Sequence, residues 1–135
     1  MAAYEVMGMD DGFVSKDVIL LVDADAQSRA SMQTILHAAG YAVFSSPNAK
    51  AAVKLCTMIH FDLIVSRVIL PVGGISGIPW ATSTATSKVG ILLMSYAERN
   101  LLEGIPKSVD YDFLPNPFTQ EQLIGKVRQR LQQLV

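Results

Sequence analysis

The sequence predicts a doubly wound α/β domain, in which a five-stranded parallel sheet lies between two layers of helices. Two observations support this prediction. Short apolar runs without polar alternation are typical of strands that are buried on both faces, as in a parallel sheet. Stretches with helical periodicity separate these runs, and strand and helix alternate about five times along the chain.

The composition fits one domain with a well-formed core. Half of the 135 residues are hydrophobic and 17% are charged, which is typical of a globular chain. The net charge of −1 creates no strong field that would attract nucleic acid or an anionic membrane. We therefore expect neither of these as a partner.

The cysteine and histidine content argues against a metal site. The single cysteine, Cys56, allows no disulfide within the chain, and its apolar neighbours predict a half-buried thiol rather than a nucleophile. His37 and His60, each placed at the end of a predicted helix, lack the spacing of metal ligands. We expect no metal and no other cofactor.

Residues 1–16 are predicted to be a flexible extension before a domain that spans residues 17–135. The extension carries Glu5, Asp10 and Asp11 and has no basic start followed by an apolar core. It is typical of neither a signal peptide nor a membrane span, and we expect a cytoplasmic protein.

Five apolar runs are the predicted strands. They cover residues 18–22, 41–44, 63–65, 91–94 and, more weakly, 111–114. In a doubly wound sheet, ligands bind beyond the carboxyl ends of the strands, so the residues that follow each run are the candidates for a functional site.

Three helices have recognisable boundaries. Asp25 is predicted to cap the first, which runs to about Ala39 and stops at Gly40. The second is predicted to start at Ser46 and Pro47, since proline fits the first turn of a helix. The apolar faces are predicted to be Met32, Ile35, Leu36 and Ala39 in the first helix, and Ala51, Ala52, Leu55 and either Met58 or Ile59 in the second.

The last helix opens with a capping box of Thr119 and Gln122. Its apolar stripe is predicted to consist of Leu123, Val127, Leu131 and Leu134. Three basic residues of this helix, Lys126, Arg128 and Arg130, are interpreted as a solvated face rather than a phosphate-binding patch. Between residues 71 and 88, glycines, a proline and a Ser/Thr run predict a short helix and much loop.

Four segments at the predicted strand ends resemble one known family. DVILLVDAD, FDLIVSRVILP, ILLMSYAE and DYDFLPNPF together resemble the receiver domain of bacterial two-component response regulators, over about residues 17–134. The resemblance implies the flavodoxin-like, CheY-like three-layer α/β/α fold. It also implies a role in two-component phosphorelay signal transduction.

The family's phosphorylation site has four parts, and this sequence keeps only some of them. The resemblance implies an acceptor aspartate after the third strand, two metal-binding acids after the first, a hydroxyl after the fourth, and a lysine before a proline after the fifth. Counting back from Pro71, the acceptor position is Arg67, which has no nucleophile at neutral pH. The vestigial site comprises Asp23, Ala24, Arg67, Ser95, Asn116 and Pro117.

These departures predict a degenerate pseudo-receiver that binds a partner and is not an enzyme. Asp25 lies one position beyond the acidic pair, where a helix cap is the simpler interpretation. Because the first and third strands are neighbours in this fold, Arg67 is predicted to form an internal salt bridge with Asp23. That pair would replace both the metal and the missing lysine.

The resemblance also implies a contact surface on the fourth helix, fifth strand and fifth helix. Its candidate residues are Tyr96, Leu101, Leu102, Tyr111 and Phe113. The implied partner is a histidine kinase, another receiver or an effector protein, with a homodimer as a further alternative. Phe113 occupies the position of the family's switching aromatic, and Tyr96 either crowds its path or lies on the surface.

Two other functions are left open by the sequence. The first is a small-molecule or anion sensor that uses Arg67, Ser95 and the glycine-rich loop at the same strand-end cleft. The second is a working receiver with an unusual acceptor. Phosphorylation of the purified chain would separate the second from a pseudo-receiver.

Overall fold

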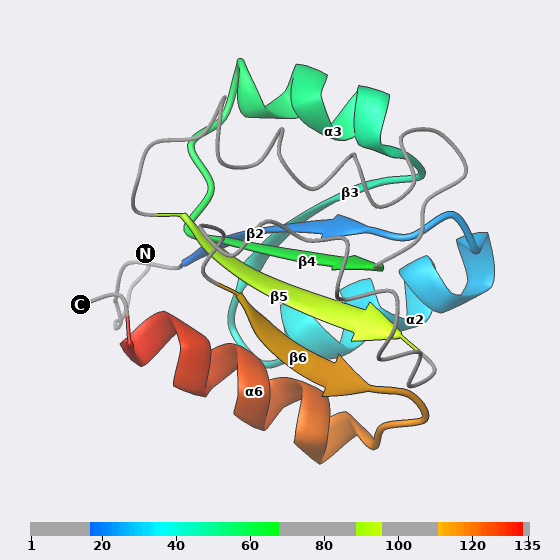
Figure 1. Cartoon of the computed structure of the whole chain (residues 1–135), viewed down its shortest axis with the longest axis vertical. Coiled ribbons are helices and arrows are strands. Elements are labelled where there is room, and N and C mark those ends of the chain that lie inside the picture. The colour runs from blue at the N-terminus through cyan, green and yellow to red at the C-terminus, as the bar shows by residue number, and fades with distance from the viewer. Residues whose placement is uncertain (1–16, 68–88, 96–110, 134–135) are drawn as a thin grey trace, which may run out of the picture.

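The computed structural model describes residues 17–67, 89–95 and 111–133, and these form a five-stranded parallel sheet with helices on both faces (Figure 1). The sheet order is β3-β2-β4-β5-β6, so the winding reverses between β2 and β4. The predicted doubly wound fold is therefore confirmed. The strands are β2 (Val18–Val22), β3 (Ala42–Ser46), β4 (Leu63–Arg67), β5 (Gly90–Ser95) and β6 (Asp112–Pro115).

Each predicted strand is present, but β3 and β4 extend further toward their carboxyl ends than the apolar runs indicated. Ser66 and Arg67 continue β4 because their backbones pair with Leu93 and Met94 of β5. Backbone pairing does not depend on side-chain polarity, which is why the apolar pattern missed these residues. The extension places Arg67 at the last position of a central strand.

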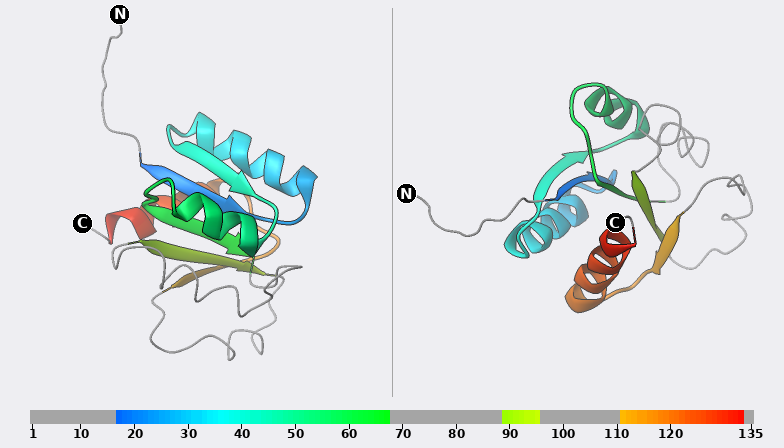
Figure 2. Two further views of the ribbon diagram at one scale, coloured as in Figure 1. Left: turned by 90° about the horizontal axis from the view of Figure 1, so that it is seen from above. Right: turned by 90° about the vertical axis from the view of Figure 1, so that its left-hand side faces the viewer.

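The two faces of the sheet carry two separate hydrophobic clusters. One contains Leu20, Ile64 and Leu93 and is covered by α3 (Ala49–Cys56); the other contains Leu21, Val65 and Leu92 and is covered by α2 (Ala26–Ala38) and α6 (Gln120–Gln132). Figure 2 shows α3 on one side of the sheet and α2 and α6 on the other. Because successive strand residues face opposite clusters, both layers hold β2 and β4 rigidly.

Helix α2 starts as predicted, with the Asp25 carboxylate accepting hydrogen bonds from the backbone N–H groups of Gln27 and Ser28. Met32 and Leu36 are buried, as expected. The placement of Ala39 on the apolar face is wrong, because Ala39 is the exposed C-cap. Gly40 then leaves the helix with a φ of 104°, a conformation that glycine adopts without strain.

Helix α3 starts later than predicted. Its N-cap is Asn48, whose side chain accepts a 2.8 Å hydrogen bond from the N–H of Ala51, so Pro47 precedes the helix instead of forming its first turn. The helix ends at Cys56, well before His60, which was expected to end it. Of the two candidates beyond Leu55, Ile59 packs on the core, whereas Met58 is 66% exposed.

Cys56 is half-buried, as expected. Burial raises the pKa of its thiol, so the thiol stays protonated at neutral pH and is a poor nucleophile.

Helix α6 begins with the predicted capping box of Thr119 and Gln122. Its predicted stripe is buried at Leu123, Val127 and Leu131, and Leu134 lies outside the described residues. The interpretation of the basic residues as a solvated face is wrong for Arg130, which is only 6% exposed and donates to the Gln133 side chain at 3.2 Å. A long aliphatic stem lets an arginine pack in this way.

Several expectations fall on residues outside the described ranges. These are the loop at 71–88, the extension at 1–16, and the partner candidates Tyr96, Leu101 and Leu102. Within the described ranges, no helix combines the length and the apolar character that crossing a bilayer would require.

Candidate functional site

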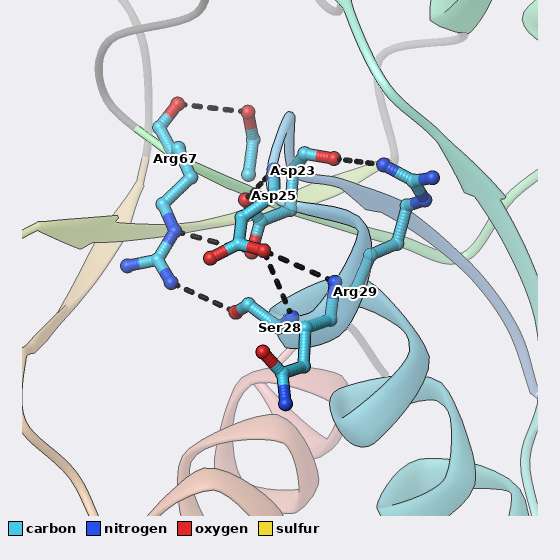
Figure 3. A network of polar contacts seen from close by, with 7 residues as sticks. Asp23, Asp25, Ser28, Arg29 and Arg67 are labelled. Carbon is cyan, nitrogen blue, oxygen red and sulfur yellow. Dashed lines mark hydrogen bonds and ion pairs between the residues drawn. The ribbon is translucent and has the colours of Figure 1, made fainter.

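The carboxyl ends of β2 and β4 bring Asp23 and Arg67 together. The two strands are parallel neighbours, with Val22 paired to Ser66, so the next residue of each lies at the same edge of the sheet. Arg67 Nε lies 3.3 Å from Asp23 Oδ2 (Figure 3). The predicted salt bridge is confirmed.

This ion pair is largely withdrawn from water. The Asp23 side chain is 3% exposed and the Arg67 side chain 18%. Solvent screening is weak at such a site, so removing either partner leaves a poorly compensated charge. The pair therefore differs from a surface ion pair, which contributes little.

The other oxygens of Asp23 also accept hydrogen bonds from protein groups. Its Oδ1 accepts a 3.0 Å hydrogen bond from the N–H of Asp25, and its backbone carbonyl accepts one from Arg29 Nη1 at 2.6 Å. Asp23 thus receives donors on both carboxylate oxygens and on its carbonyl. These are the oxygens that a hard cation such as Mg²⁺ would need.

Two residues that the sequence did not single out complete the network. Arg67 Nη2 donates a 3.0 Å hydrogen bond to Ser28 Oγ, and Arg29 binds the Asp23 carbonyl. Figure 3 shows the Arg67 side chain reaching toward both Asp23 and Ser28. The sequence signal that could have identified Ser28 and Arg29 was their position in the first turn after the Asp25 cap. The cap directs this turn toward the end of β4.

Asp25 acts as the helix cap that the simpler interpretation predicted. Its carboxylate accepts the hydrogen bonds that start α2, where an acidic group also interacts favourably with the helix dipole. Asp25 therefore does not serve as the second acid that the resemblance implies, and the residue at that position is the exposed Ala24.

The remaining members of the vestigial site lie on β5 and after β6. Ser95 is the last residue of β5, adjacent to Pro115 of β6 in the sheet. Asn116 follows β6 and is half-buried, and its Oδ1 is buried without a hydrogen-bond partner in the described part of the chain. Asn116 and the exposed Pro117 line the same groove as Arg67.

Two of the five partner-binding candidates lie in the described ranges. Tyr111 and Phe113 are half-buried and pack against the core cluster beneath α3. Phe113 is thus at least partly a core residue, and its role in partner binding stays a prediction.

At this site the positive charge of Arg67 neutralises the negative charge of Asp23. A guanidinium is protonated at any ordinary pH and cannot attack a phosphoryl group. The described ranges contain no group of three or more histidine, cysteine, aspartate or glutamate residues placed to hold a metal ion.

Comparison with known proteins finds relatives that are longer than this chain. No family model matches the chain. Protein PetR of Rhodobacter capsulatus is 30% identical over 112 residues, which are 81% of this chain and 46% of PetR. The DNA-binding transcriptional regulator NtrC of Rhizobium meliloti is 30% identical over 115 residues, 84% of this chain and 24% of NtrC. The chain spans less than half the length of either protein.

Solved structures show the same fold. The signal receiver domain of an HD domain-containing protein from Pseudomonas fluorescens is similar with a TM-score of 0.80 and 22% identity, covering 89% of this chain and 98% of that one. Chemotaxis protein CheY4 of Vibrio cholerae has a TM-score of 0.76 and 23% identity, covering 86% of this chain and 99% of CheY4. At this identity the likeness establishes the architecture.

Proposed function

We propose that this chain, a CheY-like receiver domain in its fold, is a pseudo-receiver that takes part in two-component signalling by binding a protein, without accepting a phosphoryl group. Its activity would be recognition and not catalysis. Its place would be the cytoplasm, where histidine kinases and receivers exchange signals.

The Arg67–Asp23 salt bridge is the observation that carries this proposal. At the carboxyl end of β4 a guanidinium stands where the resemblance implies an acceptor carboxylate, and it holds the remaining acid at 3.3 Å. A phosphoryl group and its metal ion both need that space and those oxygens. The pair supplies the cation internally and leaves no nucleophile.

A permanent ion pair favours one conformation of the strand ends. A switch needs two states whose balance a ligand changes. Here Asp23 is bound at once by Arg67, Arg29 and the N–H of Asp25, so an alternative arrangement loses several contacts together. The surface offered to a partner would then be constant.

The partner we propose is a histidine kinase, another receiver or an effector protein. The similarity to the sensor kinase CckA of Brucella abortus, at 26% identity over 121 residues that are 13% of CckA, supports a connection with kinases. The proposed contact surface includes Tyr111 and Phe113, together with the candidates outside the described ranges.

Phosphorylation of the purified chain tests the proposal. The protein is incubated with acetyl phosphate and magnesium and its intact mass is measured. We expect no phosphoprotein, because Arg67 offers no acceptor. A base-labile, acid-resistant phosphoryl adduct on the wild-type chain would overturn the proposal.

A partner-capture experiment tests the second half of the proposal. The chain is immobilised, and capture is compared with and without acetyl phosphate and magnesium. We expect the same histidine kinase or effector to be retained to the same extent in both cases. Retention that depends on the phosphodonor would contradict a constant binding surface.

A further inference from the structure

Strand β3 is an edge of the sheet and directs part of its backbone away from it. The sheet order β3-β2-β4-β5-β6 gives β3 a strand neighbour on one side only (Figure 2). The N–H of Ala42 donates to the Asp17 carbonyl, before β2, at 3.0 Å. In a parallel pair every second residue of a strand bonds to the same neighbour, so Val43 and Ser45 direct their N–H and C=O groups outward.

Little of this edge is covered by the described part of the chain. The Gln33 side-chain amide of α2 donates to the Val43 carbonyl at 3.4 Å, a long contact that uses one of the two lone pairs of that oxygen. Among the described residues, none pairs with the outward N–H groups of Val43 and Ser45 or with the Ser45 carbonyl. An edge with unpaired backbone groups is a template for a further strand.

The side chains of β3 lack the features that usually protect an edge strand. Proteins protect such edges with charged side chains, prolines or bulges. Strand β3 has the sequence AVFSS, and its register with β2 is continuous. Phe44 is 40% exposed even though its ring contacts Phe61 at a centroid distance of 5.9 Å. The edge therefore combines outward backbone groups with an apolar ring that is partly in water.

The outward groups of β3 match those of a second β3 that runs in the opposite direction. With a two-fold axis at Phe44, Val43 of one copy lies opposite Ser45 of the other, and each such pair exchanges both of its N–H···O=C bonds. One neighbouring register would oppose Ser45 to Tyr41, whose N–H already donates within the chain. The other would oppose Val43 to Pro47, which has no N–H. Only the register centred on Phe44 pairs all the outward groups.

We propose that β3 is a dimerisation edge, to which a second copy of this chain adds its own β3 in antiparallel orientation. Phe44 then faces Phe44 of the second copy at a non-hydrogen-bonded pair, where opposite side chains are closest. A second copy fits better than an unrelated strand, because one two-fold axis pairs the backbone groups and both rings together. The uncharged β3 also sets no like charges against each other.

Such a dimer would leave the proposed partner surface open, and in this it goes beyond the proposed function. Tyr111 and Phe113 belong to the β6 end of the sheet, opposite β3. Two copies would present two such surfaces, which would bind a partner with two sites more tightly than one copy can. A pair of five-residue strands buries little area, so we expect a dissociation constant on the order of 100 μM.

Sedimentation of the full chain over a range of concentrations tests the proposal, and we expect a monomer–dimer equilibrium. Ser45→Pro removes an outward N–H that no strand of the same copy uses, and it should weaken dimerisation by about tenfold or more. Ser45→Ala keeps this N–H and should dimerise like the wild type. Both variants lose the hydroxyl contact with Gln33, so their difference reports the backbone group.

A second set of variants does not depend on proline. Phe44→Glu and Phe44→Lys each place like charges across the two-fold axis, so each should be monomeric alone. An equimolar mixture of the two should form a heterodimer, because opposite charges then face each other. Gln129→Glu, at an exposed position of α6, is the control and should dimerise like the wild type.

Four results would overturn the proposal. One is a wild-type chain that stays monomeric up to about 1 mM. Another is a dimer that persists in Ser45→Pro and in both charge variants of Phe44, which would place the contact on another surface. The third is a mixture of the two charge variants that stays monomeric. The last is protection of the Val43 and Ser45 amides from hydrogen exchange at every concentration, which would show that the same chain covers its own edge.

None of these measurements uses acetyl phosphate or a captured partner. Failure of the dimer is therefore distinguishable from failure of the proposed function.

Discussion

Arg67 connects three elements at the carboxyl edge of the sheet. Its guanidinium contacts Asp23 at 3.3 Å and Ser28 at 3.0 Å, and these contacts connect β4, the end of β2 and the first turn of α2. Arg67 therefore supplies a structural link between three elements, and in the proposed pseudo-receiver it also stands in place of the acceptor.

Replacing Arg67 with alanine should destabilise the fold. Asp23, 3% exposed, would lose its charged partner, and we expect the free energy of unfolding to fall by about 1–3 kcal/mol. Denaturant unfolding measures this, with the exposed Arg128→Ala as the control. Arg67→Asp should be worse, since two acids would then face each other. An Arg67→Ala variant that melts at the wild-type temperature would rule out a stabilising pair.

Asp23 should bind no magnesium at millimolar concentration. Its oxygens already accept donors from Arg67, Asp25 and Arg29, and a divalent cation would be repelled by the adjacent guanidinium. Calorimetric titration with magnesium chloride should show no saturable heat. Saturable binding in the micromolar range would show that the pair opens to admit a cation.

Asp17, at the start of the sheet, makes the stability of the fold depend on pH. Partial desolvation of its carboxylate, and then repulsion from Asp62, raise its pKa above the ordinary 3.8. The folded state thus binds the proton more tightly than the unfolded state, so this carboxylate destabilises the fold above its folded pKa. As the pH falls through that folded pKa toward 3.8, the destabilisation is relieved.

Asp17→Asn should therefore raise the melting temperature slightly at neutral pH. Asp17 is exposed, so solvent screening keeps the effect small. The advantage over the wild type should disappear below pH 3.8. Thermal melts of both proteins across the acid range measure this, and an advantage that grows on acidification would contradict the assignment.

At the scale of elements, the start of α3 depends on Asn48. The Asn48 side chain accepts the N–H of Ala51 at 2.8 Å, and the Ser46 hydroxyl donates to the Asn48 carbonyl at 2.8 Å. Proline at a first turn and asparagine at a cap are both favoured at helix starts. Here the hydrogen bonds that close the turn are made by Asn48, so Asn48 caps the helix and Pro47 precedes it.

Asn48→Ala should lower the free energy of unfolding by about 1 kcal/mol, because the N–H of Ala51 loses its acceptor. The exposed Lys50→Ala on the same helix is the control, since it removes a side chain without touching the cap. Chemical unfolding of the two variants compares them. Equal stability of the two would show that the cap contributes nothing measurable.

At the scale of the whole molecule, phosphorylation should return only when several positions change together. We expect Ala24→Asp, Arg67→Asp and Asn116→Lys in one chain to be the minimum, since an acceptor, a metal ligand and a cation come from three different strand ends. Acetyl phosphate labelling of the triple variant should yield an adduct, and Arg67→Asp alone should not. Labelling of the single variant would show that the remaining site needs no further repair.

The sequence by itself determined the architecture and the identity of the central pair. Continuous apolar runs predicted the strands, since burial on both faces excludes polar alternation. The resemblance to receiver domains implied that the first and third strands are neighbours, which predicted Asp23 beside Arg67. Capping residues predicted the starts of α2 and α6, because the stabilising hydrogen bonds lie within a few residues along the chain.

Only the tertiary structure decided the features that depend on distant segments. Ser28 and Arg29 joined the site because the first turn of α2 points at the ends of β2 and β4. Arg130, assigned to a solvated face, is 6% exposed, and the groove beside Asn116 exists only where α2 meets the segment before α6. Local periodicity reports which face of a helix is apolar, whereas the packing of separate elements sets how deep a polar side chain lies and which neighbours it meets.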